Sequence, residues 1–238
     1  FSGGDIMYLL TNTLVVNIAN LIISTILSIG FAVLLRELPG KIFAKIMQTV
    51  SFFPFFISWV IVYSISQAMM GVNSGAINNI LQEAGIIDKG INVLGKEDYA
   101  YGLTIFLTQW KSLGYNAILY VAAMAGISPE LYEAAAIDGA GRWKSFWKIT
   151  IPLMTPTLFF QLLMELIESF KIFTQAYVIT QGGPLKSTYF LMLYIYEESF
   201  KNFNMGYASA LTVFLTVTVL ILTIILNYSS KKWVYSEA

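Results

Sequence analysis

The stretch from Tyr132 to Pro152 reads YEAAAIDGAGRWKSFWKITIP and sets the interpretation of the whole chain. It is polar, charged and rich in Ala and Gly, and it lies between two long apolar runs. In a chain this hydrophobic, we expect such a segment to face water and to contact another molecule. The alternative is a solvated hairpin between two membrane helices that has no partner.

The residues around this stretch predict two short helices. Ser128 can cap the first helix, and Pro129 suits its first turn, where a missing backbone N–H does no harm. Acidic residues at 130 and 133 favour the positive end of the helix dipole. Alanines 134–136 are strong helix formers, and the run 138–141 should end the helix at its glycines. A second short helix is expected through Trp143, Phe146 and Trp147.

The composition is that of a polytopic membrane protein. Of the 238 residues, 57% are hydrophobic and only 12% are charged, whereas soluble domains carry about 25% charged residues. The chain has no Cys and no His, so it lacks thiol chemistry, the commonest general base and the commonest metal ligand. We therefore predict no catalytic residue and no metal site in this chain.

Five stretches are long and apolar enough to cross a membrane, which takes about 20 residues as a helix. They are 9–35, 43–70, 101–127, 151–180 and 205–228. Pro54 should kink the second stretch, and the first carries Asn12, Asn17 and Asn20 on what we expect to be a protein-facing side. The predicted fold is all-α, a transmembrane helical bundle that forms one domain over residues 1–238.

The positions of Lys and Arg predict the orientation of this bundle. Eight lie on one predicted side of the membrane: Arg36, Lys41, Lys45, Arg142, Lys144, Lys148, Lys231 and Lys232. The other side has four, spread over longer loops: Lys89, Lys96, Lys186 and Lys201. The first side should be cytoplasmic, so that segment 128–152 lies inside and Phe1 lies outside. The outer loops are then 71–100, with a short surface helix, and 181–204, with a turn at Gly182-Gly183-Pro184.

Charged residues within the predicted spans indicate a polar path. A charge in a membrane helix costs about 2.5–3.5 kcal/mol on insertion scales and usually faces a bundle interior or a wet cavity. The fourth stretch has charged residues at intervals of three and a nearby amide: Gln161, Glu165, Glu168 and Lys171. The third stretch combines aromatic, amide and charged groups, which suit a sugar ring and its hydroxyls: Trp110, Lys111, Tyr115 and Asn116. The alternative is that these side chains form structural bonds between helices or with a partner subunit.

No GxxxxGK[ST] phosphate-binding loop occurs in the sequence. This chain is therefore not expected to bind ATP by that route.

The pattern in 133–152 resembles the cytoplasmic coupling loop, or EAA loop, of permeases of ATP-binding cassette (ABC) importers. Glu133-Ala134-Ala135 is followed after three residues by Gly139, after nine more by Ile149, and then by Ile151-Pro152, where the family usually has Leu at 151. The similarity runs from Asn12-Thr13-Leu14 through Gly206-Tyr207-Ala208-Ser209-Ala210. Residues 170–173 and the turn at 180–184 resemble the carbohydrate-uptake branch, particularly members that import oligosaccharides.

The resemblance implies a type I ABC importer permease fold in the inner membrane of a bacterium, with a sixth span before residue 1. It also implies an assembly of two related permeases, two ATPase copies that bind ATP and Mg, an external solute-binding protein, a sugar substrate and membrane lipid, without nucleic acid. No cofactor is expected in this chain. In the coupling loop, Glu133 would anchor the ATPase, Gly139 would allow close approach and Arg142 would add an ionic contact. Three further loop residues belong to the same predicted contact: Ala134, Ala135 and Asp138.

Three alternatives stay open at this point. The chain could be complete with five spans. The cargo could be an amino acid, a peptide or an osmolyte instead of a sugar. The chain could also be a membrane-embedded enzyme that acts on lipid-linked sugars, although it offers no His or Cys for such chemistry.

Overall fold

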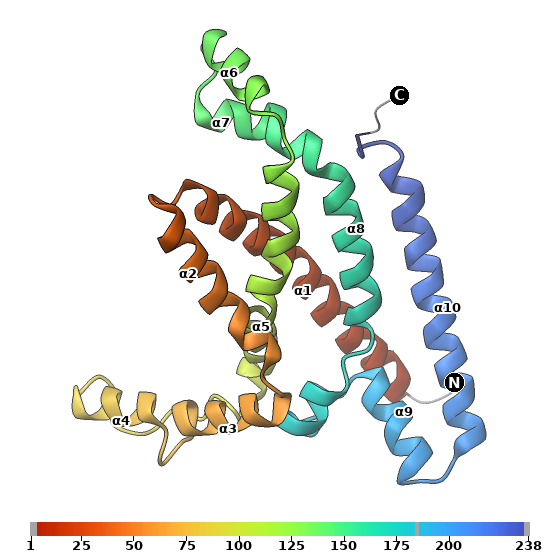
Figure 1. The fold of residues 1–238 in the computed structure, drawn as a ribbon. Coiled ribbons are helices and arrows are strands. Elements are labelled where there is room, and N and C mark those ends of the chain that lie inside the picture. The colour runs from red at the N-terminus through yellow and green to blue at the C-terminus, as the bar shows by residue number, and fades with distance from the viewer. Residues whose placement is uncertain (1–3, 184–185, 236–238) are drawn as a thin grey trace. The chain divides into compact units, whose positions relative to one another are not determined.

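The computed structural model describes residues 4–183 and 186–235, and its regular elements in these ranges are all helical (Figure 1). The all-α prediction is therefore confirmed for the described residues. The α-helices follow one another along the chain as α1 (Gly4–Glu37), α2 (Lys41–Phe52), α3 (Trp59–Met70), α4 (Ala76–Glu83), α5 (Glu97–Ala125), α6 (Pro129–Ile137), α7 (Arg142–Ser145), α8 (Ile151–Ser169), α9 (Leu191–Phe200) and α10 (Met205–Ser230).

The chain forms two compact units, and each unit is assembled from three stretches of sequence. Unit 1 comprises the described residues of Phe1–Asn20, Phe56–Lys111 and Glu168–Thr218. Unit 2 comprises those of Leu21–Phe55, Ser112–Ile167 and Val219–Ala238. The long helices α1, α5 and α10 each contribute to both units. Neither unit therefore corresponds to one continuous segment of the sequence.

Small side chains allow the helices of unit 2 to pack closely. Ala32 of α1 and Ala117 of α5 are fully buried in one apolar cluster with Tyr120 and Met154. Gly114 of α5 lies against the backbone of α2, because a Cβ added there would be 2.2 Å from the carbonyl oxygen of Ser51. The packing of this unit thus depends on residues that keep backbones close together.

Residues 233–235 complete unit 2 by packing against α8. The ring of Trp233 lies edge-on to Phe159, with 6.3 Å between the ring centroids. The backbone N–H of Tyr235 donates a hydrogen bond to Thr155 Oγ1 at 2.7 Å.

Polar side chains of α1 and of the first long loop stabilise unit 1. Asn12, Asn17 and Asn20 are all buried, which confirms the prediction that this side of α1 packs against protein. Asn12 Nδ2 donates to the carbonyl oxygen of Lys186 at 3.0 Å. In the loop, Asn78 Nδ2 donates to the carbonyl oxygen of Gly71 at 3.0 Å, and Asn78 Oδ1 accepts from the N–H of Ile91 at 2.9 Å. These bonds hold the predicted short helix, α4, in place.

Three described helical segments are long and apolar enough to cross a membrane: Met7–Glu37, Arg142–Ser169 and Met205–Ser230. A fourth candidate is the bent pair Ile42–Phe56 and Trp59–Met70. The second predicted span is therefore broken instead of kinked. Pro54 lies in a 3₁₀ turn, Phe53–Phe56, and Ser58 then caps a new helix by accepting from the N–H of Ile61. The α5 helix has sufficient length, at 29 residues, but carries more polar side chains.

The region after α8 differs most from the sequence prediction. The expected fourth span, 151–180, ends as an α-helix at Ser169, where the N–H of Lys171 bonds to the carbonyl oxygen of Glu168 at 3.0 Å and tightens the last turn. A π-helical turn follows at Ala176–Thr180. The stretch 181–204, predicted as a loop, contains α9, whose Leu191, Leu193 and Ile195 are buried. In the predicted turn, Gly182 has a φ of 80°, whereas Pro184 lies outside the described residues.

Candidate functional site

The segment 128–152 forms a helical hairpin in unit 2 that joins α5 to α8 (Figure 1). Ser128 Oγ accepts a hydrogen bond from the N–H of Glu130 at 3.3 Å, and Pro129 begins α6, as predicted. Gly139 ends the helical conformation with φ of 72°, a left-handed value that favours glycine. The N–H of Ala140 bonds back to the carbonyl oxygen of Ala135 at 2.8 Å. The local chemistry of the sequence thus determines this turn.

The second helix of the hairpin is short and aromatic. The α7 helix continues into a π-helical turn, Phe146–Thr150, that leads directly into α8. The rings of Trp143, Phe146 and Trp147 contact one another with centroid separations between 5.3 and 5.8 Å. Trp143 is 73% exposed, so this cluster stiffens the hairpin and also presents an apolar surface.

The predicted contact residues of the hairpin are accessible. Most of them are exposed, and Ala135 is half-buried; the exposed members are Glu133, Ala134, Asp138, Gly139 and Arg142. No α6 residue is buried in this chain. The hairpin can therefore offer its acidic, small and basic side chains to another protein.

The end of α1 contacts both helices of the hairpin, and these contacts were not predicted from the sequence. Arg36 Nη1 donates to the hydroxyl of Tyr132 at 3.0 Å, and its guanidinium carbon lies 4.6 Å from the centre of that ring. The next residue, Glu37, forms an ion pair with Arg142 at 3.0 Å. The Tyr132 hydroxyl also lies 2.9 Å from Oγ1 of Thr150, which is buried.

A second candidate site surrounds Glu165 in unit 2. Glu165 Oε1 accepts hydrogen bonds from Ser24 Oγ at 2.9 Å, Asn116 Nδ2 at 2.7 Å and Gln161 Nε2 at 3.0 Å. Asn116 Nδ2 also reaches Ser24 Oγ at 3.0 Å. Helices α1, α5 and α8 are therefore joined through one carboxylate oxygen.

Three polar atoms beside or near this cluster are buried without a hydrogen-bond partner among the described residues: Glu165 Oε2, Tyr120 OH and Ser28 Oγ. Ser28 lies one helical turn from Ser24, and Tyr120 lies one turn from Asn116. Each helix thus carries polar residues at i and i+4, which share one face. Such a face can accept a further polar group.

The other predicted path residues lie in different surroundings. Glu168 and Lys171 form an ion pair at 2.8 Å, but both side chains are exposed, and Lys171 lies beyond the end of α8. In unit 1, Lys111 Nζ lies 5.7 Å from the ring centre of Trp59, and Trp110 is 38% exposed. In unit 2, Tyr115 stacks on Phe55 with 4.1 Å between the ring centroids.

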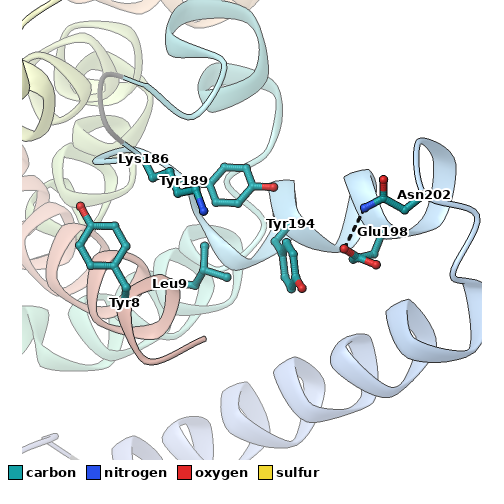
Figure 2. A pocket seen from close by; sticks show the side chains of 7 residues that line it. All are labelled: Tyr8, Leu9, Lys186, Tyr189, Tyr194, Glu198 and Asn202. Atoms are coloured by element: carbon teal, nitrogen blue, oxygen red, sulfur yellow. Dashed lines mark hydrogen bonds between the residues drawn. The ribbon is translucent and has the colours of Figure 1, made fainter. Parts of the chain in front are cut away.

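Unit 1 also contains a pocket of about 150 Å³ that the sequence did not predict, shown in Figure 2. Its lining combines three phenol rings with charged, amide and aliphatic groups: Tyr8, Leu9, Lys186, Tyr189, Tyr194, Glu198 and Asn202. Glu198 is 8% exposed and accepts hydrogen bonds from Asn202 at 2.9 Å and Asn204 at 2.8 Å. The buried acid therefore fixes the amide of Asn202 at the pocket wall.

Next to this pocket, Glu197 bonds to Lys201 and Tyr189. Lys201 Nζ donates to Glu197 Oε1 at 2.7 Å, and the Tyr189 hydroxyl donates to Glu197 Oε2. Burial raises the pKa of Glu197, but the bonds from Lys201 and Tyr189 outweigh it, so the pKa lies below its usual value. Among the described residues, no three acidic side chains come together in a group that could hold a metal ion.

Known proteins resemble this chain over nearly its whole length. The polygalacturonan/rhamnogalacturonan transport system permease protein YteP of Bacillus subtilis (strain 168) is 32% identical over 234 residues, which cover 98% of this chain and 72% of that protein. The lactose transport system permease protein LacF of Rhizobium radiobacter is 31% identical over 94% of this chain and 75% of its own length.

Solved structures share the same fold. The crystal structure of a bacterial ABC transporter involved in the import of the acidic polysaccharide alginate matches with a TM-score of 0.91 and 27% identity, over 98% of this chain and 81% of that chain. A second structure of a bacterial alginate ABC transporter, in complex with an alginate pentasaccharide-bound periplasmic protein, matches with a TM-score of 0.90 and 27% identity, over 98% of this chain and 80% of that chain.

These findings confirm the predicted type of protein. The relatives are transport permeases, as the sequence analysis predicted, and the fold is that of an ABC importer permease. The model of one family, described as the binding-protein-dependent transport system inner membrane component, matches residues 24–235. The chain therefore belongs to the family of inner membrane components of binding-protein-dependent transport systems.

Proposed function

We propose that this chain is one permease subunit of an ATP-driven importer and forms half of the translocation path for a sugar or an oligosaccharide. The observation that carries the proposal is the hairpin 128–152. The hairpin keeps Glu133, Gly139 and Arg142 accessible. The chain belongs to a transport family, and its own sequence has no phosphate-binding loop. Such a surface suits contact with a separate ATPase that binds ATP and Mg.

The proposed topology places the hairpin in the cytoplasm of a bacterium and five spans in the inner membrane. The three apolar helical segments and the bent pair supply four of these spans. The α5 helix supplies the fifth, because 29 residues of helix extend about 43 Å and the hydrocarbon core is about 30 Å thick. The distribution of Lys and Arg supports this orientation.

Carbohydrate is the proposed class of substrate. The relatives reported above are named for polygalacturonan, rhamnogalacturonan and lactose, and the structural neighbours for alginate. We propose that a solute-binding protein delivers the sugar, by analogy with the periplasmic protein bound to the alginate transporter. A second, related permease would form the other half of the path.

We propose that the polar residues of the spans line this path. Around Glu165, the amides of Asn116 and Gln161 and the unpartnered Glu165 Oε2 are the kind of groups that exchange hydrogen bonds with sugar hydroxyls. Five other residues, which offer aromatic faces or charges, complete the proposed set: Trp110, Lys111, Tyr115, Glu168 and Lys171.

The proposed mechanism is alternating access. ATP binding closes the two ATPases and moves the hairpins, which opens the path to the outside, where the sugar enters. Hydrolysis then returns the permeases to the inward-facing state. The chain itself contributes the hairpin that receives the movement and the helices that enclose the path.

Co-purification of the chain with the ATPase from its own host tests this proposal. Glu133→Arg should lose both ATPase association and sugar uptake, whereas Glu130→Arg, which changes the other exposed acid of the same helix, should retain both. A wild-type chain that brings down no ATPase would overturn the proposal. Uptake of radiolabelled lactose and of a galacturonate oligomer, compared with labelled amino acids, would separate a sugar from a non-sugar substrate.

A further inference from the structure

The C-terminal end of α1 fixes the hairpin at two points. Arg36 holds Tyr132 of α6, both through the hydroxyl at 3.0 Å and over the ring at 4.6 Å. Glu37 holds Arg142 of α7 at 3.0 Å. Two consecutive residues of one helix therefore contact both helices of the hairpin, although the partners are 96 and 105 positions apart in the sequence.

The contact of Arg36 extends to the start of α8. The Tyr132 hydroxyl lies 2.9 Å from Oγ1 of Thr150, which is 3% exposed and directly precedes α8. Because Thr150 is buried, this end of the hydrogen-bonded chain cannot move without disturbing the core of unit 2. The chain Arg36–Tyr132–Thr150 thus joins α1, α6 and α8.

The α1 helix is held at a second point in unit 2. Ser24 of α1 donates to Glu165 of α8, and 12 residues separate Ser24 from Arg36. At a rise of 1.5 Å per residue this spacing is about 18 Å along the helix axis. The α1 helix is therefore held against the start of α8 near Arg36 and against Glu165 near Ser24. These two contacts prevent α1 from tilting freely against α8.

We propose that α1 carries the movement of the hairpin into the helical bundle together with α8. Arg36 and Glu37 are the positioning residues that fix the hairpin to α1. A force on α6 and α7 then moves α1 and α8 together, as one rigid body, instead of bending the hairpin. This inference rests on the proposed function, because it assumes that an ATPase moves the hairpin.

The ion pair Glu37–Arg142 allows a sharp test by charge reversal. Its side chains are 52% and 91% exposed, so either charge can be reversed without burying it. Glu37→Arg and Arg142→Glu each place like charges together, and the double variant restores an opposite pair. Lys144→Glu is the matched control, because it reverses another exposed charge of α7. Tyr132→Phe removes the hydroxyl bonds but keeps the ring under Arg36.

The measurement is the distance between a spin label on α1 and one on α6 in the complete transporter in nanodiscs. The chain has no native Cys, so Leu34→Cys and Ala136→Cys, both at exposed positions, provide the two labelling sites. We expect one narrow distance population, unchanged between the nucleotide-free and the ATP-bound state. Either single reversal, and Tyr132→Phe to a lesser extent, should lose this narrow population, while the double reversal and Lys144→Glu should keep it.

Two outcomes would overturn the inference. One is a distance between α1 and α6 that changes with ATP in the unaltered chain. The other is a narrow population that survives both single reversals. ATP hydrolysis by the same samples is measured in parallel. Its absence from the wild-type complex would contradict the proposed function. Normal hydrolysis together with either outcome above would contradict only the proposed role of α1.

Discussion

Asn116 of α5 donates a hydrogen bond of 2.7 Å to Glu165 of α8, and the same carboxylate oxygen accepts from α1 and from Gln161. One acidic side chain thus serves as the common acceptor for three helices. Donors that are left without an acceptor in a buried site are costly.

Glu165→Ala should destabilise unit 2, because it leaves the donors of Ser24, Asn116 and Gln161 without their acceptor. We expect a loss of about 1–3 kcal/mol, seen as a lower Tm of the purified protein in detergent. Glu165→Gln keeps an acceptor oxygen and should lose less. If both variants keep the wild-type Tm but alter uptake, Glu165 acts on the substrate and not as a structural tie.

Gly114→Ala should also destabilise the protein, since the added Cβ would lie 2.2 Å from the carbonyl oxygen of Ser51. The helices α2 and α5 must then separate, at a cost of about 1–3 kcal/mol, typical of overpacking. Gly102→Ala is the matched control, because it lies on the same helix with no atom within 4 Å of the added Cβ. Thermal unfolding should rank Gly114→Ala below wild type and Gly102→Ala at or above it.

Two substitutions of Gly139 distinguish whether the hairpin needs glycine for the conformation of its turn or for close approach of a partner. Gly139 has φ of 72°, and no atom lies within 4 Å of an added Cβ. Gly139→Val should strain the turn by about 1–2 kcal/mol, whereas Gly139→Asn tolerates the left-handed conformation. If only the valine variant loses ATPase association and uptake, the turn is the requirement. If both lose them while still inserting into the membrane, close approach of the partner is the requirement.

The bonded group around Glu197 predicts a stability that depends on pH. Because the pKa of Glu197 is lowered in the folded protein, this residue adds to the free energy of unfolding at pH values above its pKa in the unfolded chain, about 4.3. That contribution is lost as the pH falls through the lower pKa that Glu197 has in the folded protein. Lys201→Gln removes the cationic partner and should reduce this dependence of Tm on pH below 5, whereas Lys89→Gln, at an exposed lysine of another loop, should leave it unchanged.

The parts of the fold that depend on neighbouring residues could be predicted from the sequence. Ser128 and Gly139 set the limits of α6 through their own conformational preferences, and the fifth predicted span matches α10 closely. The helix α9 was missed, because ten residues are too few for a membrane span and its apolar residues do not form a long run. The break near Pro54 was predicted only as a kink, since sequence does not show how far a helix bends.

The candidate sites depend on how distant helices align. The residue Glu165 could be singled out as a charge in a span, but its three donors come from α1, α5 and α8, and their register is not visible in the sequence. The pair Arg36–Tyr132 joins residues 96 positions apart. The pocket of unit 1 combines Tyr8 with residues near position 190, and neither stretch alone indicates a pocket.

The interleaving of the two units has a consequence for biosynthesis. Unit 1 draws on residues up to Thr218, and unit 2 is completed by Trp233 and Tyr235 against α8. A ribosome that has released only the first half of this chain has therefore produced neither finished core. Unit 1 cannot be completed until most of α10 has been made, and unit 2 cannot be completed until residues 233–235 have been made.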